Sequence, residues 1–150
     1  MKHKLTNREQ EELLGQPDPQ YATELRNLVY LQISLNYGMR RTELMDLTWP
    51  RVDCQNGVIM LKDRLTNQVV KLSEPTVTLL NEWEGRQLSE WQKRRQTGDL
   101  FGKYVFTELD GTTLDEEYIS KMMRMYGESA GIKTTIDSDL LHESYKESLT

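Results

Sequence analysis

Several residue types are scarce in this chain of 150 residues, and each scarcity narrows what the protein can be. Cys54 is the single cysteine, so an intramolecular disulfide is impossible and a cytoplasmic setting is the simplest interpretation. The two histidines, His3 and His142, are far apart and have no ligand-spaced partner, so the sequence supports no metal site. It also contains no glycine-rich phosphate loop and no arguable Ser–His–Asp set, and we expect no cofactor.

Long apolar runs and an excess of basic charge are missing as well. No apolar segment approaches the ~18 residues of a membrane span, and the N-terminus lacks the apolar core of a signal peptide, so no membrane partner is expected. The net charge of −5 argues against a strong stand-alone nucleic-acid binder, but it is compatible with a locally basic face. Six basic residues fall within one short stretch: Arg40, Arg41, Arg51, Lys62, Arg64 and Lys71.

The first third of the chain predicts three helices. Thr6 and Glu9 form a capping-box pattern at the start of the first helix. Residues 20–37 carry apolar side chains at helical spacing on a broad face, which indicates a helix central to the core. Gly38 is suited to end that helix in a left-handed conformation, and a short helix is expected from Arg40 to about Leu47.

The rest of the chain predicts a small hairpin followed by more helices. Residues 57–72 are typical of a β-hairpin, and a helix begins at Ser73 and Pro75 and ends at Gly98. A short extended piece at residues 104–106 and a turn at 110–111 come next. Thr113 is expected to cap a helix with Glu116 at the third position, and a last short helix begins near Asp139. The predicted fold class is α+β, mainly helical, with one small β-hairpin or sheet.

The most informative segment is residues 36–53, where two arginines open the short helix. A helix N-terminus carries partial positive charge, so Arg40 and Arg41 are unfavourable there unless a negative group lies nearby. Glu43 supplies part of that charge, and a bound phosphate would supply the rest. An ordinary surface pair of arginine and glutamate is the alternative reading of the same residues.

The segment also resembles the first arginine box of the tyrosine recombinases, the phage integrase family. In that box a Gly–apolar–Arg–x–x–Glu–Leu run precedes Leu–x–Trp and an acidic turn. Eight residues match it in order and spacing: Gly38, Met39, Arg40, Glu43, Leu44, Leu47, Trp49 and Asp53. The resemblance extends from about Leu5 to Tyr145 and implies a recombinase catalytic domain, with the hairpin where that family places its small sheet.

The resemblance implies roles for several residues. Family members cut DNA with a tyrosine hydroxyl while two arginines hold the scissile phosphate, because fixed cations stabilise the charge of the transition state. Arg40 matches the first arginine, Glu43 would brace it, and Arg41 is the neighbouring alternative. Lys62 is our choice for the hairpin lysine, although Arg64 could also reach a phosphate.

The second box departs from the family pattern His–x–x–Arg. One alignment puts Asp139 at the histidine position and His142 at the arginine position, and a shift of one residue puts Ser138 and Leu141 there instead. Both alignments lack the second arginine, and losing a phosphate-clamping cation costs about 3–4 kcal/mol of transition-state stabilisation. The nucleophilic tyrosine is missing too, because Tyr145 lies too close to this box and is expected to be a packing residue.

We therefore expect residues 1–150 to be one integrase-like catalytic domain, a truncated and degenerate copy without the N-terminal DNA-clamping domain or the C-terminal nucleophile helix. It would belong to DNA integration and site-specific recombination, would bind duplex DNA weakly alone, and would not cleave it unaided. Other recombinase subunits are the second expected partner. Two alternatives stay open: a non-enzymatic DNA-binding regulator on this fold, and a helical protein-interaction domain.

Overall fold

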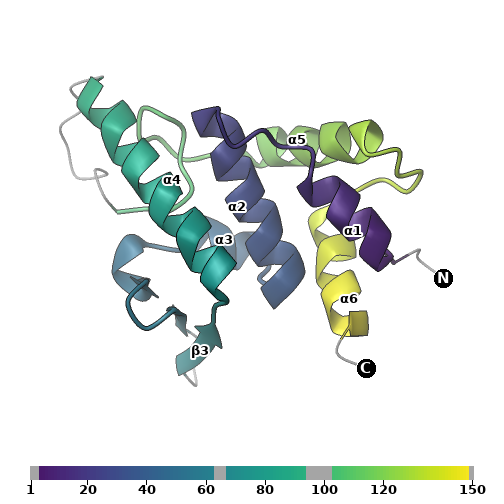
Figure 1. Cartoon of the computed structure of the whole chain (residues 1–150), viewed down its shortest axis with the longest axis horizontal. Helices are drawn as coiled ribbons and strands as arrows, with labels where there is room; N and C mark the ends of the chain where they lie inside the picture. The colour runs from purple at the N-terminus through teal and green to yellow at the C-terminus, as the bar shows by residue number, and fades with distance from the viewer. Residues whose placement is uncertain (1–3, 63–66, 94–102, 149–150) are drawn as a thin grey trace.

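The computed structural model describes residues 4–62, 67–93 and 103–148, in which helices surround one central helix (Figure 1). The central helix α2 lies between α4 on one side and α1 with α6 on the other, and α5 crosses near one end. The helices are α1 (Asn7–Leu14), α2 (Ala22–Tyr37), α3 (Arg41–Asp46), the 3₁₀ turn η1 (Trp49–Arg51), α4 (Glu74–Lys93), α5 (Glu116–Ser129) and α6 (Ser138–Ser148). Among these residues, no helix is both long and apolar enough to cross a membrane.

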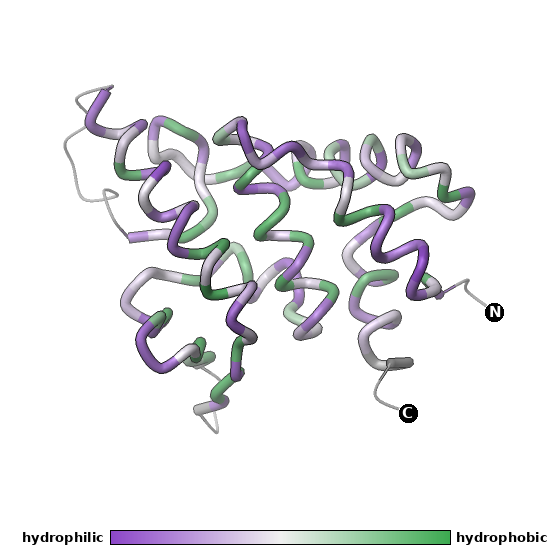
Figure 2. The backbone as a smooth tube through the Cα atoms, in the orientation of Figure 1, coloured by the Kyte–Doolittle hydropathy of each residue, from purple (hydrophilic) through white to green (hydrophobic). Residues whose placement is uncertain are grey.

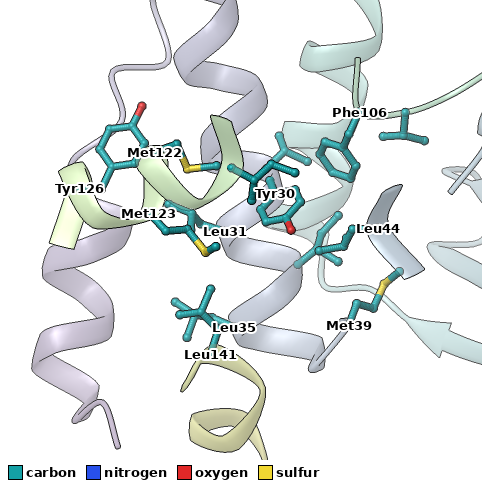
Figure 3. Packing of buried hydrophobic residues seen from close by; sticks show 14 of the residues in the cluster. Tyr30, Leu31, Leu35, Met39, Leu44, Phe106, Met122, Met123, Tyr126 and Leu141 are labelled. Atoms are coloured by element: carbon teal, nitrogen blue, oxygen red, sulfur yellow. The ribbon is translucent and has the colours of Figure 1, made fainter. Parts of the chain in front are cut away.

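Helix α2 is central because it is apolar on most of its surface, as its sequence predicted. Ten of its sixteen residues are buried, and Figure 2 shows apolar colour along much of its length. Side chains from α5, α6 and the segment after α2 converge on it (Figure 3), and Tyr30 meets Phe106 edge to face at 5.4 Å. Burial of this apolar surface is the main source of stability for such a domain.

The sheet has three antiparallel strands in the order β1-β2-β3: β1 (Val52–Asp53), β2 (Val58–Lys62) and β3 (Asn67–Lys71). Strands β2 and β3 form the predicted hairpin, with Val58 opposite Lys71 and Met60 opposite Val69. Strand β1 was not predicted because two residues are too few to show an alternating pattern. The small sheet therefore follows closely on α3, which the two arginines open, with η1 between them.

Most predicted helix ends are confirmed, and one is wrong. The Thr6 and Glu9 capping box forms, and Gly38 ends α2 with φ 69°. Thr113 does not cap α5, because it still pairs with Thr107 in an isolated β-bridge. Asp115 is the cap instead, and its carboxylate accepts the backbone N–H of Glu117 at 3.1 Å. The predicted end of α4 at Gly98 lies outside the described residues.

A buried polar cluster joins Trp49, the first residue of η1, to α4. The indole of Trp49 donates to Gln87 Oε1 at 2.8 Å, and Gln87 Nε2 in turn donates to the Tyr104 carbonyl and the Thr107 hydroxyl. Thr48 and Tyr104 form a β-bridge, so the extended piece expected at residues 104–106 is confirmed at Tyr104, while residues 105 and 106 form a bend. The tryptophan of the box is therefore held by a buried hydrogen bond to the opposite helix.

Candidate functional site

The backbone turn before α3 fixes where Arg40 points. Gly38 ends α2 in the left-handed region, so the chain reverses sharply and Arg40 becomes the cap residue of α3. The Glu43 carboxylate accepts the backbone N–H of Arg40 at 2.9 Å. A charge-assisted hydrogen bond of this kind holds the main chain and leaves the guanidinium to make other contacts. Glu43 therefore braces Arg40 through its backbone.

A cleft of about 320 Å³ lies between the start of α3, helix α5 and the first turns of α6. It brings together four residues that the sequence singled out, although they lie far apart in the chain. Its lining residues are Arg40, Arg41, Thr42, Ser120, Met123, Asp137, Ser138, Asp139 and His142. Two arginines and one histidine thus face the same space as two aspartates.

His142 connects Arg40 to the end of α2. Its Nδ1 lies 2.9 Å from the Gly38 carbonyl oxygen, and its Nε2 lies 3.2 Å from Arg40 Nη2. A carbonyl oxygen only accepts and a guanidinium only donates, so Nδ1 carries the proton and Nε2 offers its lone pair. The imidazole is therefore a neutral acceptor toward Arg40 in this arrangement.

Arg41 is engaged differently from its neighbour. Its Nη2 lies 3.2 Å from Glu116 Oε1 at the start of α5, and both side chains are partly exposed. Glu116 supplies the negative charge that an arginine at a helix start needs. The Arg41 charge is thereby offset within the protein, whereas in the described residues Arg40 has no carboxylate within salt-bridge distance.

A buried tyrosine lies behind the cleft. The Tyr30 side chain is 2% exposed, and its hydroxyl has no hydrogen-bond partner among the described residues. Burial raises the pKa of Tyr30 to about 12, and the nearby Ser138 hydroxyl and Arg41 charge oppose that rise only in part. Tyr30 is therefore a neutral phenol at physiological pH.

The negative groups at the start of α6 have separate roles. Asp137 Oδ1 accepts the backbone N–H of Leu140 at 2.8 Å and so caps the helix. Asp139 is exposed on the cleft wall. Its carboxylate would repel an anion in the cleft, whereas the open N–H groups of Arg40 would attract one.

The comparisons with known proteins agree with this architecture. The model of the phage integrase family matches residues 3–144, which is nearly the whole chain. The chain belongs to the phage integrase family. The tyrosine recombinase XerD of Vibrio cholerae is 29% identical over 133 residues, covering 85% of this chain and 41% of XerD. The integrase-family chain thus spans less than half the length of that curated relative.

Solved structures of recombinases share the fold. The crystal structure of XerA recombinase superimposes with a TM-score of 0.81 at 22% identity, covering 99% of this chain and 51% of XerA. The site-specific recombinase XerH, bound to its difH substrate in a pre-cleavage complex, gives a TM-score of 0.75 at 22% identity. That match covers 99% of this chain and 43% of XerH. The mainly helical fold with its small sheet is therefore the recombinase catalytic-domain fold.

Some of the other predicted residues of this family member lie in the described part of the chain, and some lie outside it. The backbone of Lys62 ends β2, but its side chain and all of Arg64 lie outside the described part of the chain. Tyr145 is half-buried against Gly38, where an added Cβ would overlap its ring, as expected of a packing residue. Cys54 is half-buried, and burial with the nearby charges of Glu84 and Asp53 raises the pKa of its thiol, which fits an unreactive cysteine.

Several residues in or near the cleft of the integrase-family chain were not predicted from sequence. Glu116 was interpreted only as a residue favoured at a helix start, and nothing local in the sequence pairs it with Arg41. Ser120 and Met123 lie on α5 without a motif that would single them out, and Tyr30 is one of many buried residues on α2. In residues 4–62, 67–93 and 103–148, no group of three or more His, Cys, Asp or Glu side chains is placed to hold a metal ion.

Proposed function

We propose that this chain is a recombinase-type domain that binds the phosphate backbone of duplex DNA and acts in DNA integration and site-specific recombination. The observation that carries the proposal is the exposed Arg40 guanidinium in a cleft, held from one side and open on the other. Arginine suits this role because its planar fork binds two phosphate oxygens at once. Membership of the phage integrase family supports the same conclusion.

The proposed DNA contact extends beyond Arg40. Arg41 lies in the same cleft and would add a second, weaker phosphate contact because Glu116 already offsets its charge. Lys62 at the end of β2 and Arg64, two residues further along the sequence, are proposed to contact phosphates further along the duplex. The acidic net charge of the chain keeps the affinity low when the domain acts alone.

We further propose that the chain does not cleave DNA unaided. Among the described residues, the cleft is lined by no tyrosine and by no arginine from α6. Leu141 points from α6 into the core (Figure 3), and His142 presents a lone pair to Arg40, so neither adds a second cation. Without that cation, the developing charge on a transferred phosphoryl group would be poorly stabilised.

Fluorescence anisotropy with a labelled random-sequence duplex, measured across a salt series, tests the proposed phosphate site. We expect binding at low salt with a log–log slope of about −2 to −4, as two to four phosphate contacts would give. Arg40→Ala should weaken binding about tenfold or more, because it removes a charged bidentate contact. The matched control is Arg8→Ala, which removes an arginine side chain 88% exposed on α1 and should leave the affinity unchanged.

Two outcomes would contradict this proposal. Absence of binding at low salt, or equal losses from Arg40→Ala and Arg8→Ala, would remove the cleft as a DNA site. The helical protein-interaction alternative would then move forward. An exposed apolar face on α6 would support that alternative. Within the described residues, however, the exposed large apolar side chains lie on other segments: they are Tyr21, Met60, Val69, Leu88 and Met125.

A second assay separates an enzyme from a regulator on the same fold. A duplex carrying a nick beside its recombination site traps a covalent protein–DNA link when a recombinase cleaves it. We expect no covalent product from this chain, even at concentrations that saturate binding. A trapped product would overturn the proposal of cleavage incompetence while leaving the DNA-binding proposal intact.

A further inference from the structure

Resting on the proposed phosphate site, we propose that His142 is a positioning residue for Arg40 and is not itself a phosphate-binding cation. The histidine bridges two groups that only one neutral tautomer can satisfy. Its Nδ1–H donates to the Gly38 carbonyl at 2.9 Å, and its Nε2 accepts from Arg40 Nη2 at 3.2 Å. The opposite tautomer or the imidazolium would set an N–H against the guanidinium.

Helix α6 holds the histidine at the correct rotation. Leu141 is fully buried in the core, and the Ser144 hydroxyl, three residues on and therefore on the same face of the helix, accepts the backbone N–H of Leu5 at 3.0 Å. The ring of Tyr145, also on this face, packs on Gly38, where an added Cβ would overlap it. These contacts fix the packed face of α6, and His142 beside it reaches the carbonyl of Gly38 and Arg40.

Gly38 contributes to this arrangement through both its backbone conformation and its carbonyl oxygen. Its left-handed conformation turns the chain at the end of α2, and its buried position lets the Tyr145 ring approach closely. The same residue supplies the carbonyl that sets the tautomer of His142. The end of α2 therefore determines the orientation of Arg40 through the histidine, even though Arg40 is exposed.

The role of the histidine differs from that of a second arginine. A cation at this position would repel Arg40, whereas a neutral acceptor binds one of its five N–H groups and leaves the others open. Held by Nη2 alone, the guanidinium keeps further N–H groups for two phosphate oxygens. Pre-ordering of this long side chain reduces the entropy lost on binding.

Two isosteric substitutions separate the two contacts of the imidazole. His142→Asn keeps a donor near the Nδ1 position and so keeps the Gly38 contact, but it removes the acceptor for Arg40. His142→Gln places an amide oxygen near the Nε2 position and keeps that acceptor. In the anisotropy assay we expect Asn to weaken binding about fivefold to tenfold with an unchanged salt slope, and Gln to stay within about twofold of the wild type.

An Arg40→Ala background completes the test. If the histidine acts through Arg40, His142→Asn has no further effect once Arg40 is gone. If the histidine binds phosphate itself, Asn and Gln weaken binding alike, and the loss persists in the Arg40→Ala background. The latter result would overturn the proposal. Circular dichroism and urea midpoints of both variants establish that each is folded.

A spectroscopic measurement tests the positioning role even if no DNA is bound. His3→Gln leaves His142 as the single histidine, and long-range ¹H–¹⁵N correlation at about pH 8 reports which ring nitrogen carries the proton. We expect the Nδ1–H tautomer in the free protein. The Nε2–H tautomer would overturn the proposal by itself. Failure of DNA binding together with the Nδ1–H tautomer would instead refute the phosphate site and keep the histidine–arginine contact.

Discussion

The interior around Arg26 and the cleft around Arg40 use the same side chain in opposite ways. Arg26 is 1% exposed, and its nitrogens donate to Asn27 Oδ1, the Thr107 carbonyl and the Tyr118 hydroxyl. Arg40 is exposed, and among the described residues the one hydrogen-bond partner of its guanidinium is the His142 imidazole nitrogen. An arginine saturated by internal acceptors ties the fold together, whereas one with open N–H groups is available to a ligand.

Arg26 and Arg40 also differ in whether an acidic side chain lies near the guanidinium. The Glu108 carboxylate lies 3.9 Å from Arg26, and the Tyr118 ring lies 5.1 Å from its guanidinium carbon. Arg41, next to the cleft arginine, is paired with Glu116 at 3.2 Å. Within the described part of the chain, Arg40 is thus the one of these three arginines that has no carboxylate within 4.0 Å of its guanidinium. This contrast supports the choice of Arg40 as the phosphate-binding residue.

Replacing Arg26 should have the largest effect on stability. Arg26→Ala removes a buried cation together with all of its hydrogen bonds, including those to Asn27 Oδ1 and to the Thr107 carbonyl. The Tyr118 hydroxyl loses one donor and keeps Asn27 Nδ2. We expect the free energy of unfolding to fall by about 3–5 kcal/mol. Urea unfolding measures this loss. Arg40→Ala is the matched control and should change the same quantity by less than about 0.5 kcal/mol, so similar losses in both variants would break the comparison.

Gly38→Ala should have the second largest effect on the free energy of unfolding, because it changes the backbone that holds the cleft. The added methyl group would overlap the Tyr145 ring, and the alanine backbone would have to adopt a φ of 69°. We expect a loss of about 2–4 kcal/mol in unfolding free energy, from overpacking and left-handed strain together. Gly131→Ala is the control, since it shares a positive φ but would meet no atom within 4 Å. Equal losses would mean that strain alone matters and that packing on Tyr145 does not.

The buried phenol of Tyr30 should make the stability of the domain depend on alkaline pH. Burial raises the pKa of Tyr30 to about 12, so the unfolded chain loses its phenolic proton first as pH rises above about 10. Stability present below pH ~10 should therefore be lost up to pH ~12, by as much as about 3 kcal/mol. Tyr30→Phe should show a smaller loss over that window, measured by urea midpoints.

At neutral pH the same substitution sharpens the comparison further. Tyr30→Phe removes a hydroxyl that has no hydrogen-bond partner in the described residues, so we expect a change of less than about 1 kcal/mol. Tyr118→Phe removes the acceptor 2.7 Å from Arg26 Nη2 and should cost about 1.5–3 kcal/mol. If the two phenylalanine variants were equally stable, the hydroxyl of Tyr118 would not contribute as the geometry implies.

The smallest expected effect concerns the acid on the cleft wall. Asp139→Asn removes an exposed negative charge beside Arg40 and should strengthen binding of duplex DNA about twofold to threefold at low salt. The gain should vanish at high salt because screening removes such interactions between exposed charges. Asp110→Asn, on an exposed turn that does not line the cleft, is the control in the same anisotropy assay.

Local signals predicted much of the fold, because helix caps and apolar spacing act over a few residues. Thr6, Gly38 and the residues of the β2–β3 hairpin behave as their sequence indicates. The cap of α5 was missed because Thr113 is held by a bridge to Thr107, a contact that no local pattern shows. Residue spacing therefore predicts elements well and predicts their ends less well where tertiary pairing competes.

The site was predictable only in part for the same reason. The box around Arg40 is contiguous in sequence, so its arginine and Glu43 could be identified directly. The contact between Arg40 and His142 joins residues separated by 102 positions, and the neutral role of the histidine depends on the Gly38 carbonyl. Sequence resemblance placed His142 near the site, but only the geometry distinguishes an acceptor from a cation.

The hydrogen bond from Leu5 to Ser144 joins positions 139 residues apart and has a consequence for how the domain is made. Contacts of such long range slow folding, because most of the chain must be ordered before they form. On the ribosome, Arg40 emerges long before His142, so the early chain carries a loosely held arginine. The cleft is assembled only when α6 reaches Gly38, which would couple the onset of the proposed phosphate binding to completion of the fold.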